Sequence, residues 1–214
     1  MESNSQTLKS PVTFHKVSEE EADIHHPIFA QLIILYINIF AEPPYNECFS
    51  QETVTEEFCH YIKNGILFYA LTDDHVIGFL GVTRGMENCR KDIKKELKNV
   101  GIFSDTDLYL ADLAVAKKFR RQKIGSSLMD KMMILYPHEN MYLRTSAVRG
   151  NEKVIAFYQK LGFNIIEKRE RVENTRTNGS IDYDERLYMY KTQNHYYSDR
   201  HSGDGYKSGA EHLY

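Results

Sequence analysis

Cysteine is scarce in this sequence of 214 residues, which contains 3 of them. Cys48, Cys59 and Cys89 are widely spaced, so they fit neither a disulfide framework nor the ligand spacing of a zinc site. We therefore expect a reduced protein without a metal ion. A cytoplasmic location follows as an expectation, because disulfides are rare in that compartment.

Long hydrophobic runs are missing too. The longest apolar stretch, residues 28–41, is interrupted by Gln31 and Asn38, whereas a membrane-spanning helix needs about 20 apolar residues. The opening residues, MESNSQTLKS, lack the apolar core of a secretory signal peptide. We expect neither a membrane partner nor export.

The chain has no large excess of one charge. It carries 27 Lys and Arg against 30 Asp and Glu, a formal net charge of -3. Nothing global therefore draws it to nucleic acid or to an acidic membrane. One local exception is the run KKFRRQK at residues 117–123, where five of seven side chains are cations.

Hydrophobic periodicity predicts an alternation of strands and helices with no internal repeat. The α/β (or α+β) class follows, with a mixed central sheet flanked by helices. We expect strands at 12–17, 66–71, 76–82, 108–115, 141–146, 163–172 and 183–191, and helices at 27–42, 52–64, 88–98, 124–136 and 151–161.

Three segments stand apart from this pattern. Residues 1–10 and 192–214 are polar and poor in aliphatic side chains, so we expect a flexible N-terminus and a flexible tail. Between them, residues 11–191 form one predicted domain. Within that domain, residues 85–107 are polar and charged, and we interpret them as a variable insertion.

The basic run lies between a predicted strand and a predicted helix. A helix N-terminus presents free N–H groups and the positive end of a dipole, which favour an anion. Gly125 allows close approach of the backbone, Ser126 adds a hydroxyl, and Arg120, Arg121 and Lys123 add charge. We expect a polyphosphate here, although neither GxxxxGK[ST] nor GxGxxG is present. A localisation signal or an RNA-binding patch is the alternative at this point.

The segment LADLAVAKKFRRQKIGSSLM resembles motif A of the GNAT superfamily of acyl-CoA N-acyltransferases, (Q/R)-x-x-G-x-(G/A) after a strand of the type D-L-x-V. Arg120 takes the first position and Gly125 the last. Lys123 replaces the middle glycine, and a lysine can make this turn if its φ stays negative. Residues 151–163 are similar to motif B, N-x-x-A-x-x-F-Y-x-x-x-G-F, with one extra residue in the first half. The resemblance covers most of residues 12–191.

The resemblance implies an N-acetyltransferase that uses acetyl-CoA as co-substrate and no metal. It implies two parallel strands that splay to admit pantetheine, and a bulge whose freed N–H groups polarise the thioester carbonyl. The residues that it assigns to acetyl-CoA are Leu113, Ala114, Val115, Arg120, Arg121, Gln122, Lys123, Ile124, Gly125, Ser126, Asn151 and Lys153.

Two residues are candidates for proton transfer. An alkylamine has a pKa near ~10.4 and must lose a proton to react, whereas the departing thiolate gains one. Asp112, beside the expected bulge, is our candidate for the base, and Tyr158 is our candidate for the acid. The alternatives are an outward-facing strand carboxylate and a tyrosine that only packs in the core.

The loop between the first two helices reads EPPYNE. Glu42, Tyr45 and Glu47 would suit a cationic amine, unless the loop serves only to break the helix. We hypothesise that the acceptor is a small cationic amine. The alternatives are an N-terminal or lysine protein acetyltransferase, and a non-catalytic module that binds CoA or nucleic acid. The expected acceptor is thus a small molecule or a peptide. The sequence leaves open whether the protein forms a homodimer.

Overall fold

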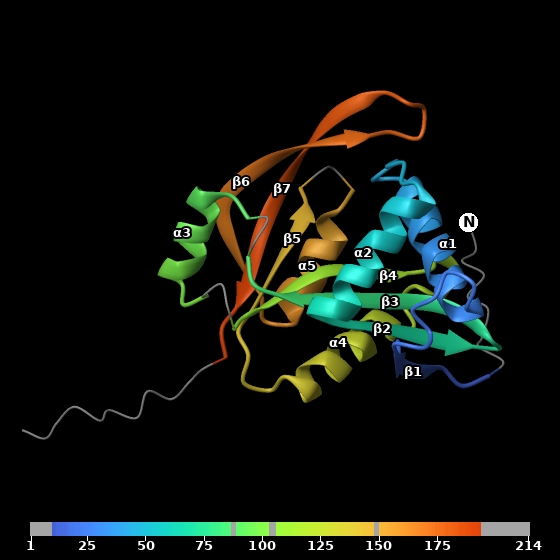
Figure 1. Cartoon of the computed structure of the whole chain (residues 1–214). Coiled ribbons are helices and arrows are strands. Elements are labelled where there is room, and N and C mark those ends of the chain that lie inside the picture. Colours follow the sequence, from blue (N-terminus) through green and yellow to red (C-terminus); the bar gives the residue numbers. More distant parts are fainter. Residues whose placement is uncertain (1–9, 87–88, 103–105, 148–149, 194–214) are drawn as a thin grey trace, which may run out of the picture.

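A sheet with helices on both faces organises the chain (Figure 1), and the computed structural model describes residues 10–86, 89–102, 106–147 and 150–193. The elements in chain order are β1 (Thr13–Lys16), α1 (Pro27–Ala41), α2 (Gln51–Asn64), β2 (Gly65–Thr72), β3 (His75–Arg84), α3 (Lys91–Asn99), β4 (Leu108–Val115), the 3-10 helix η1 (Lys117–Phe119), α4 (Ile124–Leu135), β5 (Met141–Ser146), α5 (Glu152–Lys160), β6 (Asn164–Thr175) and β7 (Ile181–Lys191).

The predicted elements are all present, in the predicted order. The hairpin of β6 and β7 is longer than predicted, since many of its side chains are exposed and lack a hydrophobic signal. The predicted loose ends fall almost entirely on residues 1–9 and 194–214, outside the described residues. The division of the chain into one domain with flexible ends stays a prediction.

The strands form a mixed 7-stranded sheet in the order β1-β2-β3-β4-β5-β7-β6. Within it, β4 and β5 are parallel, and the other neighbouring pairs are antiparallel. The β2–β3 hairpin turns at Asp73 and Asp74, both with a positive φ, which aspartate tolerates better than most residues. The predicted α/β class with a mixed central sheet is confirmed.

Successive residues of β2 serve the two faces of the sheet. Leu67 and Tyr69 pack with α1 and α2, whereas Phe68 packs on the opposite face with α4. No helix in the described ranges is both long and apolar enough to cross a membrane. The predicted insertion contributes α3, whose Ile93 and Leu97 are buried in a separate cluster with residues of β5, β6 and β7.

Two irregularities of β4 determine the geometry of the site. The pairing of β4 with β5 extends only from Leu108–Met141 to Leu110–Leu143, and beyond it the two strands diverge. The register between β3 and β4 also shifts, because Val82 lies opposite Leu110 and Gly81 lies opposite Asp112. Ala111 is therefore an extra residue, a β-bulge next to Asp112. The predicted splay and the predicted bulge are both present.

Candidate active site

A cavity of about 300 Å³ opens where β4 and β5 diverge. Elements from both halves of the chain line it, including α1, α2, β4, β5, α5 and the β6–β7 hairpin. Both candidate proton-transfer residues, Asp112 and Tyr158, lie in its wall, as do Tyr45 and Glu47 from the loop after α1. The fold thus gathers into one cavity residues that are far apart in the sequence.

The Asp112 carboxylate faces this cavity and α2, so it is not an outward-facing strand residue. Its Oδ2 atom accepts a hydrogen bond of 2.5 Å from the Tyr61 hydroxyl. Burial raises the pKa of Asp112 to about 6, although the Tyr61 hydrogen bond pulls this pKa down. A carboxylate with a pKa just below neutrality is suited to act as a general base at pH 7.

Tyr61 lies in the helix predicted at residues 52–64 and was not among the candidate site residues. Ser50 caps the N-terminus of α2 by accepting a 3.1 Å hydrogen bond from the Thr53 N–H. The ring of Tyr61 lies against Gly81, where an added Cβ would approach the ring carbons to 2.4 Å. Because Gly81 pairs with Asp112 across the sheet, a glycine there makes room for the ring beside the carboxylate. No local pattern in the sequence signals this pairing.

Tyr158 is 7% exposed and packs edge-on against Phe157 and Phe163. Burial raises its pKa well above the ordinary value of a tyrosine, so the hydroxyl stays protonated at neutral pH. Tyr158 therefore belongs to the core and also lines the cavity, which means that the two interpretations of this residue are compatible. Its role as the acid stays a prediction.

The turn before α4 takes a conformation that the sequence analysis did not expect. Arg121 has a φ of 66° and Lys123 a φ of 64°. The condition of a negative φ at Lys123 was therefore wrong. The chain must reverse direction immediately before the helix, and Lys123 does so in the left-handed region, where a non-glycine residue pays about 1–2 kcal/mol. As the N-cap of α4, Lys123 makes no side-chain capping hydrogen bond.

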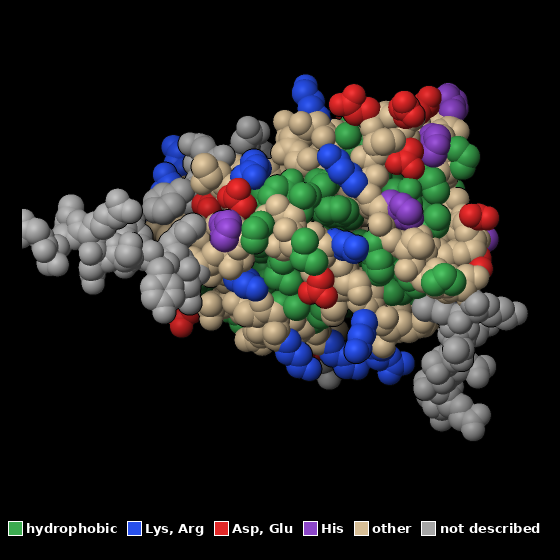
Figure 2. All heavy atoms as spheres, turned by 90° about the horizontal axis from the view of Figure 1, so that it is seen from below, with side chains coloured by type: hydrophobic (Ala, Val, Ile, Leu, Met, Phe, Trp, Pro, Cys, Tyr) green, Lys and Arg blue, Asp and Glu red, His purple; other side chains and the backbone are tan. Residues whose placement is uncertain are grey.

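The first turn of α4 therefore presents N–H groups without a side-chain cap, which is the arrangement that binds anions. Figure 2, viewed from the side of α4, shows Lys and Arg side chains along one edge of the molecule. Ile124, the first residue of α4, is buried in the core. A Cβ on Gly125 would meet only ordinary contacts, the nearest at 3.8 Å. Gln122 and Ser126 are partly exposed, and Lys153 is exposed in the first turn of α5.

At the end of β4, the candidate residues face different environments. Leu113 lines the cavity, and Ala114 packs with α1 and α2. The carbonyl of Val115 accepts a 2.9 Å hydrogen bond from Arg120 Nε, and Arg120 Nη2 lies 3.7 Å from the Glu42 carboxylate. Glu42 thus lies toward the basic turn and is outside the lining of the cavity.

Asn151 is 1% exposed and connects three parts of the site. Its Nδ2 donates hydrogen bonds of 2.6 Å to the Ser146 carbonyl and 3.2 Å to the Thr145 hydroxyl. Its Oδ1 accepts a 3.2 Å hydrogen bond from the Tyr45 hydroxyl. The Asn151 side chain therefore holds β5, α5 and the loop after α1 together.

An ion pair and several hydrogen bonds bind the loop between α1 and α2 to the β6–β7 hairpin. Glu47 is 5% exposed and lies 2.5 Å from Arg186, while within the hairpin Arg176 lies 2.6 Å from Asp184. Arg176 also donates a 2.6 Å hydrogen bond to the Tyr45 carbonyl. Backbone hydrogen bonds of 2.8 and 2.9 Å connect the loop to residues 175 and 177. The sequence alone did not predict this closure, because the two segments are more than 100 residues apart.

The family of the chain follows from a comparison with protein-family models. The model described as "Acetyltransferase (GNAT) family" matches residues 34–163, more than half of the chain. The chain belongs to the GNAT acetyltransferase family. It is therefore an acyltransferase, and the matched range contains the diverging strands, the basic turn and both proton-transfer candidates.

Solved structures resemble this GNAT acetyltransferase in fold. Ribosomal-protein-alanine N-acetyltransferase from Brucella melitensis has a TM-score of 0.57 at 15% identity, covering 85% of this chain and 99% of that chain. Naa50 from Arabidopsis thaliana, in complex with the bisubstrate analogue CoA-Ac-MVNAL, has a TM-score of 0.53 at 19% identity. The match covers 85% of this chain and 99% of that chain. NAA60 from Arabidopsis thaliana, in complex with acetyl-CoA, has a TM-score of 0.58 at 12% identity. The match covers 86% of this chain and 100% of that chain. No curated protein matched the chain.

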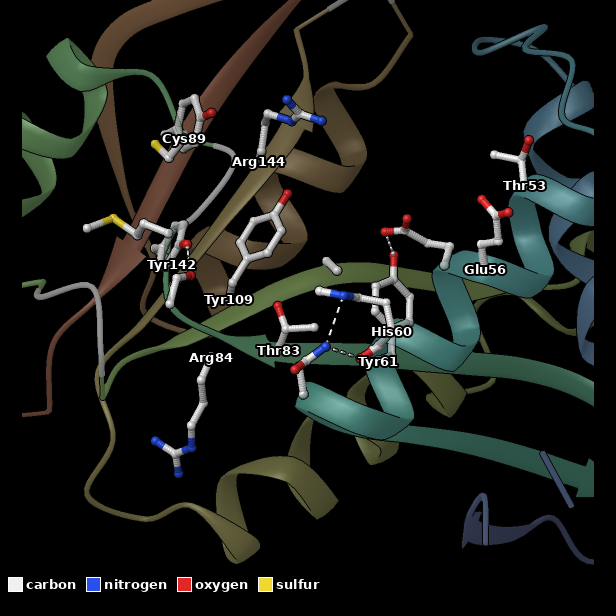
Figure 3. Close-up of a pocket in the computed structure, with 16 residues that line it drawn as sticks. Thr53, Glu56, His60, Tyr61, Thr83, Arg84, Cys89, Tyr109, Tyr142 and Arg144 are labelled. Carbon is white, nitrogen blue, oxygen red and sulfur yellow. Dashed lines mark hydrogen bonds between the residues drawn. The ribbon is translucent and has the colours of Figure 1, made fainter. Parts of the chain in front are cut away.

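This GNAT acetyltransferase has a second, larger cavity of about 580 Å³ beside the first (Figure 3). Its walls come from α2, the end of β3, and strands β4, β5 and β7. The two cavities share Glu57, Tyr61, Tyr109, Ala111 and Arg144. Within the described ranges, no group of three or more His, Cys, Asp or Glu residues could hold a metal ion.

Proposed function

We propose that this chain transfers the acetyl group of acetyl-CoA to a primary amine. The observation that carries the proposal is the divergence of β4 from β5 at the Ala111 bulge, with Asp112 beside it in the cavity. Diverging strands expose unpaired backbone groups that can pair with an extended ligand such as pantetheine. The uncapped first turn of α4, with Arg121 and Lys123 next to it, would bind the pyrophosphate.

Asp112 and Tyr158 would divide the proton transfers between them. Asp112 would take a proton from the amine nitrogen as that nitrogen bonds to the acetyl carbon, because its pKa of about 6 leaves it ionised at pH 7. Tyr158, held protonated by burial, would donate a hydrogen bond to the departing sulfur. The reaction class is direct acyl transfer, and its proposed reactants are acetyl-CoA and the amine.

The proposed acceptor is a small cationic amine. The small cavity is closed on one side by the Glu47–Arg186 pair, which limits its width, and Glu47, Glu57 and Asp112 place carboxylates around it. Tyr45 adds an aromatic wall. A peptide N-terminus is the second candidate, since the similar Naa50 structure carries the bisubstrate analogue CoA-Ac-MVNAL. The proposal includes a cytoplasmic location, which the free thiols of the cysteines support.

Thiol release from acetyl-CoA tests the proposal. The purified chain would be offered spermidine, an aminoglycoside, free amino acids and a peptide with an N-terminal alanine. Turnover with a small amine supports the proposed acceptor, and turnover with the peptide alone would replace it by the second candidate. Acetyl-CoA should also raise the melting temperature by linkage. Absence of both thiol release and a thermal shift would overturn the proposal.

A further inference from the structure

One tyrosine hydroxyl bridges two carboxylates at the wall between the two cavities. The Tyr61 hydroxyl lies 2.5 Å from Asp112 Oδ2 and 2.7 Å from Glu57 Oε1, and Figure 3 shows Tyr61 among the residues that line the larger cavity. A tyrosine carries one hydroxyl hydrogen, so it can donate to only one carboxylate at a time. Two contacts this short are both hydrogen bonds only when one carboxyl group also carries a proton.

The two ends of this bridge differ in their surroundings. Asp112 is only partly exposed and lines the small cavity but not the larger one. Glu57 is an exposed residue of α2 that lines both cavities. Tyr61, between them, is 2% exposed, and its ring is held over Gly81. The bridge therefore connects the base in the small cavity with a carboxylate that is accessible from the larger one.

We propose that Glu57, Tyr61 and Asp112 form a proton relay that carries the amine proton from the small cavity to solvent in the larger cavity. The relay rests on the proposed function, because it needs Asp112 to accept a proton from the acceptor amine. Tyr61 and Glu57 touch no reacting atom, so they are positioning residues that act through Asp112.

The proton balance of the relay is closed. Asp112 accepts one proton from the amine nitrogen and becomes a neutral carboxyl group. That group gives its proton to the Tyr61 oxygen while Tyr61 gives its own hydroxyl proton to Glu57. Asp112 is again a carboxylate, Tyr61 is again a neutral phenol, and Glu57 releases the proton to water. No oxidant, metal or further reactant takes part.

Other ionisable groups surround Asp112 and set the background of its pH profile. The ionisable residues that line the small cavity with Asp112 are Tyr36 on α1, Tyr45 and Glu47 in the loop after α1, Glu57 and Tyr61 on α2, Tyr109 on β4, Arg144 on β5, Tyr158 on α5 and Arg186 on β7, whereas β6 contributes the neutral Val172 and Asn174. Arg186 is paired with Glu47 and Arg144 with Glu170. Within this set, Tyr61 is the residue for which a hydrogen bond to Asp112 is found.

The test compares Glu57→Gln with Glu56→Gln in the full-length chain, using acetyl-CoA and the best acceptor of the amine panel. Glutamine at 57 can still accept a hydrogen bond from Tyr61 but cannot take the proton. We expect kcat to fall about tenfold to a hundredfold in Glu57→Gln, since positioned proton transfer typically contributes ~10²–10⁴-fold. Added formate or imidazole, entering the larger cavity, should restore much of the loss. Glu56 lines the same cavity, and Glu56→Gln should keep the wild-type kcat.

Tyr61→Phe keeps the ring over Gly81 and removes the hydroxyl. We expect a loss of kcat similar to that of Glu57→Gln. Formate in the larger cavity should not restore kcat, because the missing Tyr61 hydroxyl leaves Asp112 without a partner that can pass the proton on. The affinity for acetyl-CoA should not change in any of these variants.

Each outcome decides the proposal. Wild-type kcat and pH profile in Glu57→Gln, or an equal loss in Glu56→Gln, would overturn the relay and leave the proposed function intact. Failure of the wild-type chain to release thiol with any acceptor would overturn the proposed function, and the relay with it.

Discussion

The two sides of the diverging strands are built by different means. On the side of α4, the proposed donor site consists mainly of backbone: the ends of β4, the turn at 121–123 and the free N–H groups of the first helical turn. On the side of α2, the site consists of side chains that lock one another in place, such as Glu47 with Arg186 and Tyr61 with Asp112.

This difference has a physical reason. CoA presents the same phosphates and pantetheine to every enzyme that uses it, so backbone groups that bind them suffice. An acceptor amine has to be distinguished from other amines, which requires charges and hydrogen bonds at fixed positions in a partly buried site. We therefore expect substitutions on the α2 side to have large effects and substitutions on the α4 side to have small ones.

The largest effect is expected from Asp112→Asn. Loss of the base should lower kcat about 10²–10⁴-fold with little change in acetyl-CoA affinity, which thiol-release kinetics and calorimetry would measure. In the wild type, the rate should rise as the pH passes about 6, where Asp112 ionises. A variant that keeps a rate within a factor of three would show that Asp112 is not the base.

The same substitution should stabilise the fold. The pKa of Asp112 is higher in the folded chain than its ordinary value of 3.8, so the carboxyl stabilises the fold only while protonated. That contribution is lost as the pH rises through about 6. Asp112→Asn should therefore melt at a higher temperature than the wild type at pH 7, and the difference should shrink toward pH 4.

The buried ion pair of the acceptor side comes next. Glu47→Gln removes a charge that is 2.5 Å from Arg186, with both side chains largely buried, and should lower the free energy of unfolding by about 3 kcal/mol. The matched change on the donor side is Glu42→Gln, whose 3.7 Å pair with Arg120 is partly exposed. Its expected cost is below about 1 kcal/mol. Equal costs in urea unfolding would remove the contrast between the two sides.

Two glycines give a third comparison. An alanine Cβ at Gly81 would lie 2.4 Å from the Tyr61 ring, whereas at Gly125 the nearest atom would be 3.8 Å away. Gly81→Ala should cost about 1–3 kcal/mol through overpacking and lower kcat by moving Tyr61. Gly125→Ala should add about 0.5–1 kcal/mol of stability to α4, and any loss of activity should appear as weaker acetyl-CoA binding, because Gly125 lies in the proposed donor site. Melting curves and kcat of the two variants test this comparison. A Gly81→Ala enzyme with wild-type melting temperature and wild-type kcat would contradict it.

The smallest effect is expected from Lys123→Gly. Glycine relieves the left-handed strain at a φ of 64° but adds flexibility to the unfolded chain, so the net change in stability should stay within about 1 kcal/mol. Loss of one cation should weaken acetyl-CoA binding severalfold at low salt and less at high salt. Affinity measured at two salt concentrations checks this, and a salt-independent loss would assign the effect to the backbone.

The sequence was most informative where the structure depends on neighbouring residues. The bounds of β4 and β5 and the turn before α4 were predicted because strand and helix signals act over a few residues, whereas the bulge beside Asp112 was expected only from the resemblance to the GNAT superfamily. The sign of φ at Lys123 was missed, since a side-chain identity does not fix which residue of a tight turn becomes left-handed.

The sequence was least informative where distant segments meet. Tyr61 looked like an ordinary buried helix residue, and Glu57 was not a candidate at all, because their importance depends on the pairing of Gly81 with Asp112. The partner of Glu47 is Arg186, which a reading of the EPPYNE loop alone could not identify. Candidate residues could thus be named by type, but their partners required the fold.

The bulge at Ala111 changes which face of the sheet each following side chain of β4 points to. Before it, Leu108 and Leu110 point into the core under α4, and in a regular strand Asp112 would follow them there. After it, Leu113 returns to that core and Asp112 faces α2. Removing Ala111 would leave Asp112 directly after Leu110 and still opposite Gly81, whereas a ladder that paired Ala111 in regular register would turn the Asp112 carboxylate into the hydrophobic core. The irregular register thus lets one strand present Leu110 and Leu113 to the hydrophobic core and Asp112, between them, to the cavity.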